Sequence, residues 1–202
     1  MASRPPLLAG DKLNLERVSC ILVDDSQQCL DILGTVCTGF GLRNFTKCQS
    51  AAEAKQALSS AAFDLMLTDA NMPGENGYQL IEWLRRHGSE ANRYIPVIIV
   101  TGHTRVSQIA RARDCGAHFI VAKPIVPKTI LERIFWVAKD ERAFIECSSY
   151  IGPDRRFKRE GPPPGMRGRR AEDLPAEVGE ASQPNMSQDE INLLMKPSKV
   201  RL

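Results

Sequence analysis

The chain has 202 residues, with 27 Lys and Arg against 24 Asp and Glu, and a formal net charge of +3. Charges that are this nearly balanced give no electrostatic argument for nucleic-acid binding, and we expect no DNA binding. The length allows one domain of ordinary size and an appendage. No stretch approaches the roughly 20 apolar residues that span a bilayer, and the N-terminus lacks the apolar core of a signal peptide. We therefore expect a cytoplasmic protein with no membrane span.

From Val18 to Asp140 the chain alternates strand-like and helix-like segments. Short runs with the composition of strands are each followed by apolar residues at helical spacing. The expected strands are SCILV, NFTKC, FDLMLT, PVIIV and HFIVA, and the expected helices cover residues 27–38, 51–60, 78–87, 107–115 and 129–140. Alternation of this kind predicts an α/β fold, with a parallel sheet between two layers of helices and right-handed crossovers.

Beyond this domain the composition changes. We expect a flexible N-terminal segment (1–16), a domain (17–140), a linker rich in Pro, Gly and Arg (141–185) and a short amphipathic helix (186–197). The linker has too few apolar residues to offset the entropy of ordering, so the C-terminal tail is predicted to be mostly disordered.

The short helix near the C-terminus has clear start signals. Ser187 and Glu190 form an S-x-x-E capping box, and Met186 and Ile191 stand where a hydrophobic staple would. Ile191, Leu194 and Met195 then make an apolar stripe. Because so short a helix is marginal alone in water, we expect it to need a partner surface.

Ionisable and polar side chains follow four of the expected strands. They are Asp24 and Asp25, Asp69, Thr101 and Lys123. The carboxyl ends of parallel strands share one edge of the sheet, where ligands bind, so these residues should converge. Three carboxylates at one edge repel one another unless a cation compensates. Mg²⁺ prefers such oxygen ligands and keeps several waters, so the sequence predicts a magnesium site.

The same residues have the chemistry of phosphoryl transfer. Asp69 could attack phosphorus and form an acyl phosphate, while Lys123 neutralises one phosphoryl oxygen and the Thr101 hydroxyl bonds another. The chain has no G-x-x-x-x-G-K-[ST] loop to hold a nucleotide donor. The phosphoryl group must therefore come from another protein or a small phosphodonor.

Residues 18–140 resemble the receiver domain of bacterial two-component response regulators, the CheY-like family. The matching motifs are ILVDDS, LMLTDANMPGENG, IIVTG and AKP. The resemblance implies a flavodoxin-like (βα)5 fold, a doubly wound parallel sheet in strand order 2-1-3-4-5. It also implies that Asp69 is the phosphoacceptor, that the Lys123–Pro124 bond is cis, and that the Asn71 backbone carbonyl joins Asp24, Asp25 and Asp69 as a magnesium ligand.

The implied function is that of a stand-alone receiver in a phosphorelay. Such a protein accepts a phosphoryl group from a histidine kinase or a histidine phosphotransfer protein and signals by binding. It is not an enzyme beyond its own phosphoryl transfer and dephosphorylation. In receivers, the fourth helix, fifth strand and fifth helix form the output face. The C-terminal helix resembles the receiver-binding peptide of a flagellar motor switch protein, which suggests self-docking, docking on another receiver, or competition for shared partners.

Two features depart from the family pattern. Ile120 stands where receivers commonly carry a Tyr or Phe that moves on phosphorylation, and Phe119 falls on the opposite face of the strand by alternation. Gly102 follows Thr101 where Ala or Ser is usual. His103 and Asn71 occupy positions that, in the family, influence the hydrolysis of the acyl phosphate.

An alternative function stays open. A receiver-shaped binding module could be controlled by an anionic ligand, such as a cyclic dinucleotide, at the basic part of the linker. The basic residues are Arg155, Arg156, Lys158, Arg159, Arg167, Arg169 and Arg170. Seven cations among prolines and glycines are also typical of an ordinary soluble linker.

Overall fold

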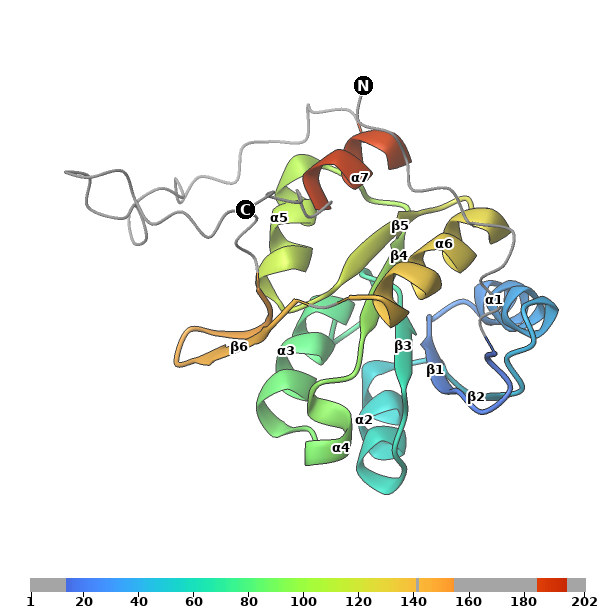
Figure 1. The fold of residues 1–202 in the computed structure, drawn as a ribbon, viewed down its shortest axis with the longest axis horizontal. Coiled ribbons are helices and arrows are strands. Elements are labelled where there is room, and N and C mark those ends of the chain that lie inside the picture. Colours follow the sequence, from blue (N-terminus) through green and yellow to red (C-terminus); the bar gives the residue numbers. More distant parts are fainter. Residues whose placement is uncertain (1–13, 141, 155–184, 196–202) are drawn as a thin grey trace.

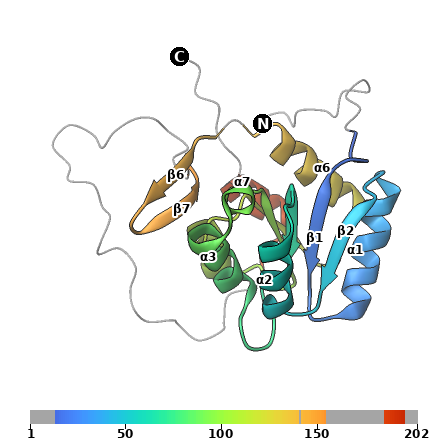
Figure 2. The same ribbon diagram turned by 90° about the horizontal axis from the view of Figure 1, so that it is seen from below.

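The computed structural model describes residues 14–140, 142–154 and 185–195. Its centre is a five-stranded sheet in the order β2-β1-β3-β4-β5, with every neighbouring pair parallel (Figures 1 and 2). The strands are β1 (Ser19–Val23), β2 (Asn44–Cys48), β3 (Leu65–Thr68), β4 (Val97–Thr101) and β5 (Phe119–Ala122). The predicted flavodoxin-like doubly wound sheet in strand order 2-1-3-4-5 is confirmed.

Helices cover both faces of this sheet, with α1 and α6 on one face and α2 and α3 on the other (Figure 2). The bounds are α1 (Gln27–Gly39), α2 (Ala51–Ser60), α3 (Gly77–His87), α4 (Glu90–Arg93), α5 (Val106–Asp114) and α6 (Pro127–Ala138). The side chains of Ser26, Ser50 and Asn76 accept backbone N–H groups at the starts of α1, α2 and α3.

The four-residue helix α4 was not predicted, because one turn is too short to show helical periodicity. The fourth and fifth helices that the sequence predicts are therefore α5 and α6 in Figure 1. The core lies at the sheet, where β3 and β4 are buried along their whole length, as expected for strands covered on both faces. No described helix is long and apolar enough to cross a membrane.

A hairpin that the sequence did not predict follows α6. The strands β6 (Phe144–Cys147) and β7 (Tyr150–Pro153) pair antiparallel, within the range expected to be linker. The Tyr150 side chain is buried, and its hydroxyl donates to the Pro153 carbonyl oxygen over 2.7 Å. The hairpin packs on the turn before β5, where Gly116 has φ +95° and a Cβ would meet the Ile151 carbonyl oxygen at 2.4 Å. Residues 141–154 are therefore part of the folded unit wherever they are described.

The two ends of the chain also differ in part from expectation. Leu15, expected in a flexible segment, is buried in the core, and its carbonyl oxygen accepts the Val18 N–H. Residues 1–13 and 155–184, which include all seven basic linker residues, lie outside the described part. The anionic-ligand alternative therefore stays a prediction from the sequence.

The C-terminal helix α7 (Gln188–Met195) lies against β5, between α5 and α6 (Figure 1). Its predicted capping box is confirmed: the Glu190 N–H donates to Ser187 Oγ, and the Ser187 N–H donates to Glu190 Oε2 over 2.7 Å. Ile191 is fully buried and Met186 half-buried. The side chains of Leu194 and Met195 lie outside the described part, so the predicted apolar stripe is described only at Ile191.

Candidate functional site

An ammonium group shared by two buried carboxylates lies at the carboxyl edge of the sheet. Lys123 Nζ, just after β5, is 2.7 Å from Asp24 Oδ2 and 2.8 Å from Asp69 Oδ1. Asp24 follows β1 and Asp69 follows β3, and both are at least nine-tenths buried. Three strands that are distant in sequence thus bring their first polar residues together, as the strand-end argument predicts.

Thr101, the last residue of β4, joins the same edge and is buried. Its hydroxyl accepts the His103 N–H over 3.2 Å, and its carbonyl oxygen accepts the Lys123 N–H over 2.9 Å. The backbone of Thr101 therefore fixes where the chain turns at Lys123. The Lys123–Pro124 peptide bond is cis, as the resemblance implies.

The loop after Asp69 folds closely back on itself. The Asn71 N–H donates to Asp69 Oδ2 over 2.5 Å, and the Gly77 N–H donates to the Ala70 carbonyl oxygen. A Cβ at Gly77 would stand 2.0 Å from the Asp69 carbonyl oxygen, so only glycine fits there. This close return places the start of α3 directly beside Asp69.

The side chains of Asn71 and His103 meet across the mouth of the site. Asn71 Nδ2 lies 2.6 Å from His103 Nδ1, which joins the loop after β3 to the loop after β4. Both side chains are exposed. The sequence placed both residues near Asp69 but did not predict that they would bond each other, because the two loops are not adjacent in sequence.

Burial and ion pairing act in opposite directions on the pKa values of the site. Burial raises the pKa of Asp69, and the hydrogen bond and charge of Lys123 offset only part of that rise. Burial alone would lower the pKa of Lys123, but its hydrogen bonds to Asp24 and Asp69 outweigh burial and raise it. Lys123 is therefore charged at neutral pH, and Asp69 is a partly desolvated, more basic carboxylate, which suits a nucleophile.

The predicted magnesium ligands are only partly brought together. Asp25 is exposed, and Lys123 stands between Asp24 and Asp69. In the described part of the chain, no group of three or more His, Cys, Asp and Glu side chains is arranged to hold a metal ion. The expected three-carboxylate cluster is thus not formed in this arrangement. The donor types still suit Mg²⁺, because it commonly takes one or two carboxylates and keeps several waters.

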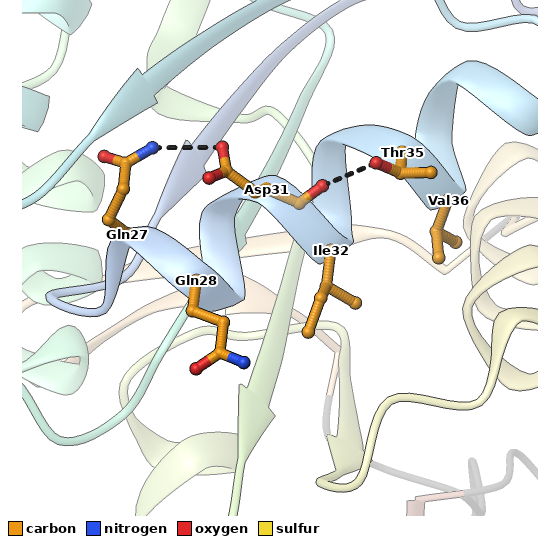
Figure 3. Close-up of a pocket in the computed structure, with 6 residues that line it drawn as sticks. All are labelled: Gln27, Gln28, Asp31, Ile32, Thr35 and Val36. Atoms are coloured by element: carbon orange, nitrogen blue, oxygen red, sulfur yellow. Dashed lines mark hydrogen bonds between the residues drawn. The ribbon is translucent and has the colours of Figure 1, made fainter.

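A surface hollow on α1 lies apart from this chemistry. Its lining comes from the outer face of one helix (Figure 3): Gln27, Gln28, Asp31, Ile32, Thr35 and Val36. Its polar groups already have partners: Gln27 Nε2 donates to Asp31 Oδ1 and Thr35 Oγ1 donates to the Asp31 carbonyl oxygen, while Lys47 of β2 pairs with Asp31 over 2.7 Å. None of the predicted site residues lines it.

The sequence missed the residues through which the C-terminal segment meets the site loops. Thr104 Oγ1 donates to the Met186 carbonyl oxygen over 2.7 Å, and the Gln188 side chain bonds the backbone of β5. Thr104 is a buried hydroxyl three residues after Thr101. A buried polar residue in a loop would have been the only signal, and burial cannot be read from one sequence.

Comparison with known proteins agrees with this geometry. The chain is 34% identical over 139 residues to the swarming motility regulation protein RssB of Serratia marcescens, a match that covers 67% of this chain and 59% of RssB. It is 30% identical over 114 residues to the chemotaxis protein CheY of Pseudomonas aeruginosa, covering 56% of this chain and 90% of CheY. The match therefore spans most of CheY but less than two thirds of RssB.

A solved structure shows the same fold. The chemotaxis protein CheY4 of Vibrio cholerae superposes with a TM-score of 0.55 at 22% identity, over 59% of this chain and 98% of CheY4. The sequence model of the response regulator receiver domain matches residues 20–135, more than half of the chain. With its strand order and its strand-end acids and lysine, the chain belongs to the response regulator receiver domain family.

Proposed function

We propose that this chain is the phosphoacceptor receiver of a two-component phosphorelay. A histidine kinase or a histidine phosphotransfer protein would donate the phosphoryl group to Asp69. The observation that carries the proposal is the Asp69 carboxylate at the end of β3, buried and 2.8 Å from the Lys123 ammonium. Membership of the receiver family supports it.

The transfer would be a single displacement at phosphorus. A carboxylate oxygen of Asp69 forms a bond to phosphorus, and the bond to the donor nitrogen or oxygen breaks, so the leaving group takes the electron pair. Lys123 neutralises a phosphoryl oxygen, and the Thr101 hydroxyl donates to another. These residues supply position and charge, on which phosphoryl transfer chiefly depends. The protein would not be an enzyme beyond this transfer and the hydrolysis of its own acyl phosphate.

Mg²⁺ belongs to the same proposal. Asp24, Asp25, Asp69 and the Asn71 backbone carbonyl would hold it, and when bound it would neutralise charge on the phosphoryl oxygens. The Lys123 ammonium already pairs with both Asp24 and Asp69, which leaves one net negative charge among the three groups. The ion would therefore add to a site whose two buried carboxylates are not left unpaired in its absence.

The output would be protein binding through α5, β5 and α6, in the cytoplasm. The described part of the chain contains only the receiver, its hairpin and α7, so binding is the output that these residues can deliver. The kinase and the output partner are to be found by experiment, beginning with the phosphoacceptor itself.

The test is incubation with acetyl phosphate and Mg²⁺, followed by mass spectrometry of the intact protein. We expect the mass of one phosphoryl group on the wild type and none on Asp69→Asn. The adduct should disappear in hydroxylamine, because that reagent cleaves acyl phosphates. A phosphoryl group that persists in Asp69→Asn, or that resists hydroxylamine, would contradict the proposal.

A further inference from the structure

The C-terminal segment is bonded to the loop that follows Thr101. The Met186 N–H donates to the Thr104 carbonyl oxygen over 3.0 Å, and Thr104 Oγ1 donates to the Met186 carbonyl oxygen over 2.7 Å. One residue earlier, Asn185 Nδ2 donates to the Gly102 carbonyl oxygen over 3.2 Å. The C-terminal segment therefore fixes the backbone of the residues that directly follow Thr101.

A second contact reaches the strand that carries Lys123. In the sheet order β5 is an edge strand, so one side of its backbone lacks a strand partner. Gln188 fills this role with its side-chain amide: Nε2 donates to the Ile120 carbonyl oxygen over 3.0 Å, and Oε1 accepts the Ala122 N–H over 2.6 Å. Ala122 is the residue before Lys123.

Apolar and polar anchors follow on α7. Ile191 is fully buried within the core cluster, and Met186 is half-buried against it. Asn192 Oδ1 accepts hydrogen bonds from Gln188 Nε2, over 2.9 Å, and from the buried Arg133 of α6. The segment from Asn185 to Asn192 thus contacts three neighbouring elements: the loop between β4 and α5, the strand β5 and the helix α6.

We propose that this segment is a tethered ligand of the α5-β5-α6 face, and that an output partner must displace it. The partner would be an amphipathic helix with the same chemistry, a glutamine amide followed three residues later by a branched aliphatic side chain. Residues 155–184 join the segment to the hairpin in the same chain. Its docking is therefore independent of protein concentration, whereas binding of a separate partner increases with the concentration of that partner.

The contacts also couple docking to the phosphorylation site, a step that rests on the proposed function. The tail bonds Gly102, next to Thr101, and Ala122, next to Lys123. A phosphoryl group on Asp69 draws on both Thr101 and Lys123, so it changes the position of the backbone to which the tail is bonded. Coupling between two equilibria is reciprocal, so docking of the tail changes the stability of the phosphorylated state as much as phosphorylation changes the stability of docking.

Docking is tested first, without a phosphodonor. A fluorescein-labelled peptide of residues 184–197 is titrated with the full-length wild type and with the full-length double variant Gln188→Ala/Ile191→Asp. If the tail occupies the face nine-tenths of the time, the wild type should bind the peptide about tenfold more weakly than the double variant. The exposed substitution Asp189→Asn is the matched control and should behave as wild type. Equal affinity in both proteins, or binding to neither, overturns the tethered ligand.

Coupling is tested on the same two proteins with acetyl phosphate and Mg²⁺. We expect the rate of Asp69 phosphorylation to differ by about fivefold or more between them, which corresponds to about 1 kcal/mol in the activation free energy. An unchanged rate overturns the coupling and leaves the docking result standing. Absence of phosphate on Asp69 in both proteins would instead overturn the proposed function, so the two failures are distinguishable. Urea unfolding of each variant verifies that the receiver is folded.

Discussion

The two ends of the sheet both bury ionisable side chains, but they balance them in different ways. At the carboxyl edge, Asp24 and Asp69 share the ammonium of Lys123. At the amino edge, the buried side chains of Arg85 and His118 are hydrogen-bonded to backbone groups. One end therefore uses opposite charges and the other uses neutral dipoles.

The amino edge forms a fixed network. The Arg85 guanidinium donates to the Gly116 carbonyl oxygen, over 3.3 and 3.1 Å, and to that of Arg93 over 2.6 Å. It also lies 5.1 Å from the centre of the Phe144 ring in the hairpin. Burial lowers the pKa of Arg85 to about 10, so it stays charged at neutral pH. The last turn of α3 also favours a cation through the helix dipole.

The difference separates the candidate functional site from a structural network. Ionic partners can be exchanged. A metal ion can take the place of the Lys123 ammonium beside the carboxylates, and a phosphoryl group can take the place of a carboxylate beside the ammonium. Backbone carbonyls and a ring cannot move away without unfolding the segment that carries them. We therefore expect changes in the Arg85 network to alter stability whether or not a ligand is present, and changes at the carboxyl edge to depend on pH and ligand.

The largest effect should come from Arg85→Met. The substitution leaves the Gly116 and Arg93 carbonyls without their donor, and each unsatisfied buried group costs about 1–3 kcal/mol. We expect a loss of about 3 kcal/mol in the free energy of unfolding in urea, equal at pH 7 and pH 8, above the pH range in which protonation of His118 affects stability. Arg86→Met, its exposed neighbour, is the matched control and should change stability by less than about 0.5 kcal/mol. A strongly pH-dependent loss would remove the contrast between the two edges.

Lys123→Met should lower the free energy of unfolding by less, about 2 kcal/mol at pH 7.5. Breaking a fully buried ion pair costs about 3–5 kcal/mol, and the Lys123 side chain is only partly buried. The cost should shrink as the pH falls. Burial already raises the folded-state pKa of Asp69, so the folded protein takes up a proton before the unfolded chain does, and a neutral carboxyl needs no counter-charge. Exposed Lys128→Met is the control. A loss that is the same at pH 5 and pH 7.5 would mean that Asp69 does not depend on Lys123.

A magnesium ion should stabilise the carboxyl edge alone. At a concentration ten times its dissociation constant, a ligand of the folded state adds about 1.4 kcal/mol. We expect thermal melting of the wild type to shift upward with Mg²⁺, and Asp24→Asn to shift much less. The Arg85→Met variant should keep the full shift, because the amino edge has no part in binding the ion. If wild-type melting is unmoved by millimolar Mg²⁺, the proposed metal ligands are wrong.

The smallest effect concerns His118 at the amino edge. Burial, then the nearby charges of Arg85 and Arg142, lower its pKa well below 6.5, and its Nδ1 accepts the Val97 N–H over 3.2 Å. The unfolded chain takes up this proton as the pH falls through about 6.5 while the folded protein does not. Stability contributed by neutral His118 is therefore present above pH 6.5 and lost below it.

Urea unfolding at pH 6.5 and 5.5 measures this loss. We expect His118 to account for about 1 kcal/mol, since one proton contributes at most about 1.4 kcal/mol per pH unit. This loss of stability between pH 6.5 and pH 5.5 should be missing from His118→Asn and present in His87→Gln, an exposed control. An identical pH dependence in both variants would show that His118 takes up its proton as readily in the folded protein as in the unfolded chain.

The sequence predicts the carboxyl edge better than the amino edge for a physical reason. Strand ends are readable from apolar runs, so Asp24, Asp69 and Lys123 could be placed together without a structure. The interposition of Lys123 between the two acids was not readable, because it depends on distances rather than on strand order. This is why a cluster of three carboxylates was expected and is not formed.

Nothing in the pattern indicated the role of Arg85. Arginine is usually exposed, and the acceptors of Arg85 are carbonyls of Gly116 and Arg93, which every residue possesses. The β6–β7 hairpin was missed because Ser148 and Ser149 join its strands without the glycine or asparagine that marks a two-residue turn. Both features depend on contacts between distant segments, about which one sequence says little.

The amide of Gln188 has a consequence for solubility. An uncovered edge strand is a template on which a strand of another molecule can assemble. While Gln188 is bonded to Ile120 and Ala122, part of β5 is closed to such assembly. A partner that displaces the tail must cover this strand itself, or two displaced molecules can join edge to edge through their β5 strands. The same glutamine that holds the tail in place thus also keeps neighbouring molecules apart.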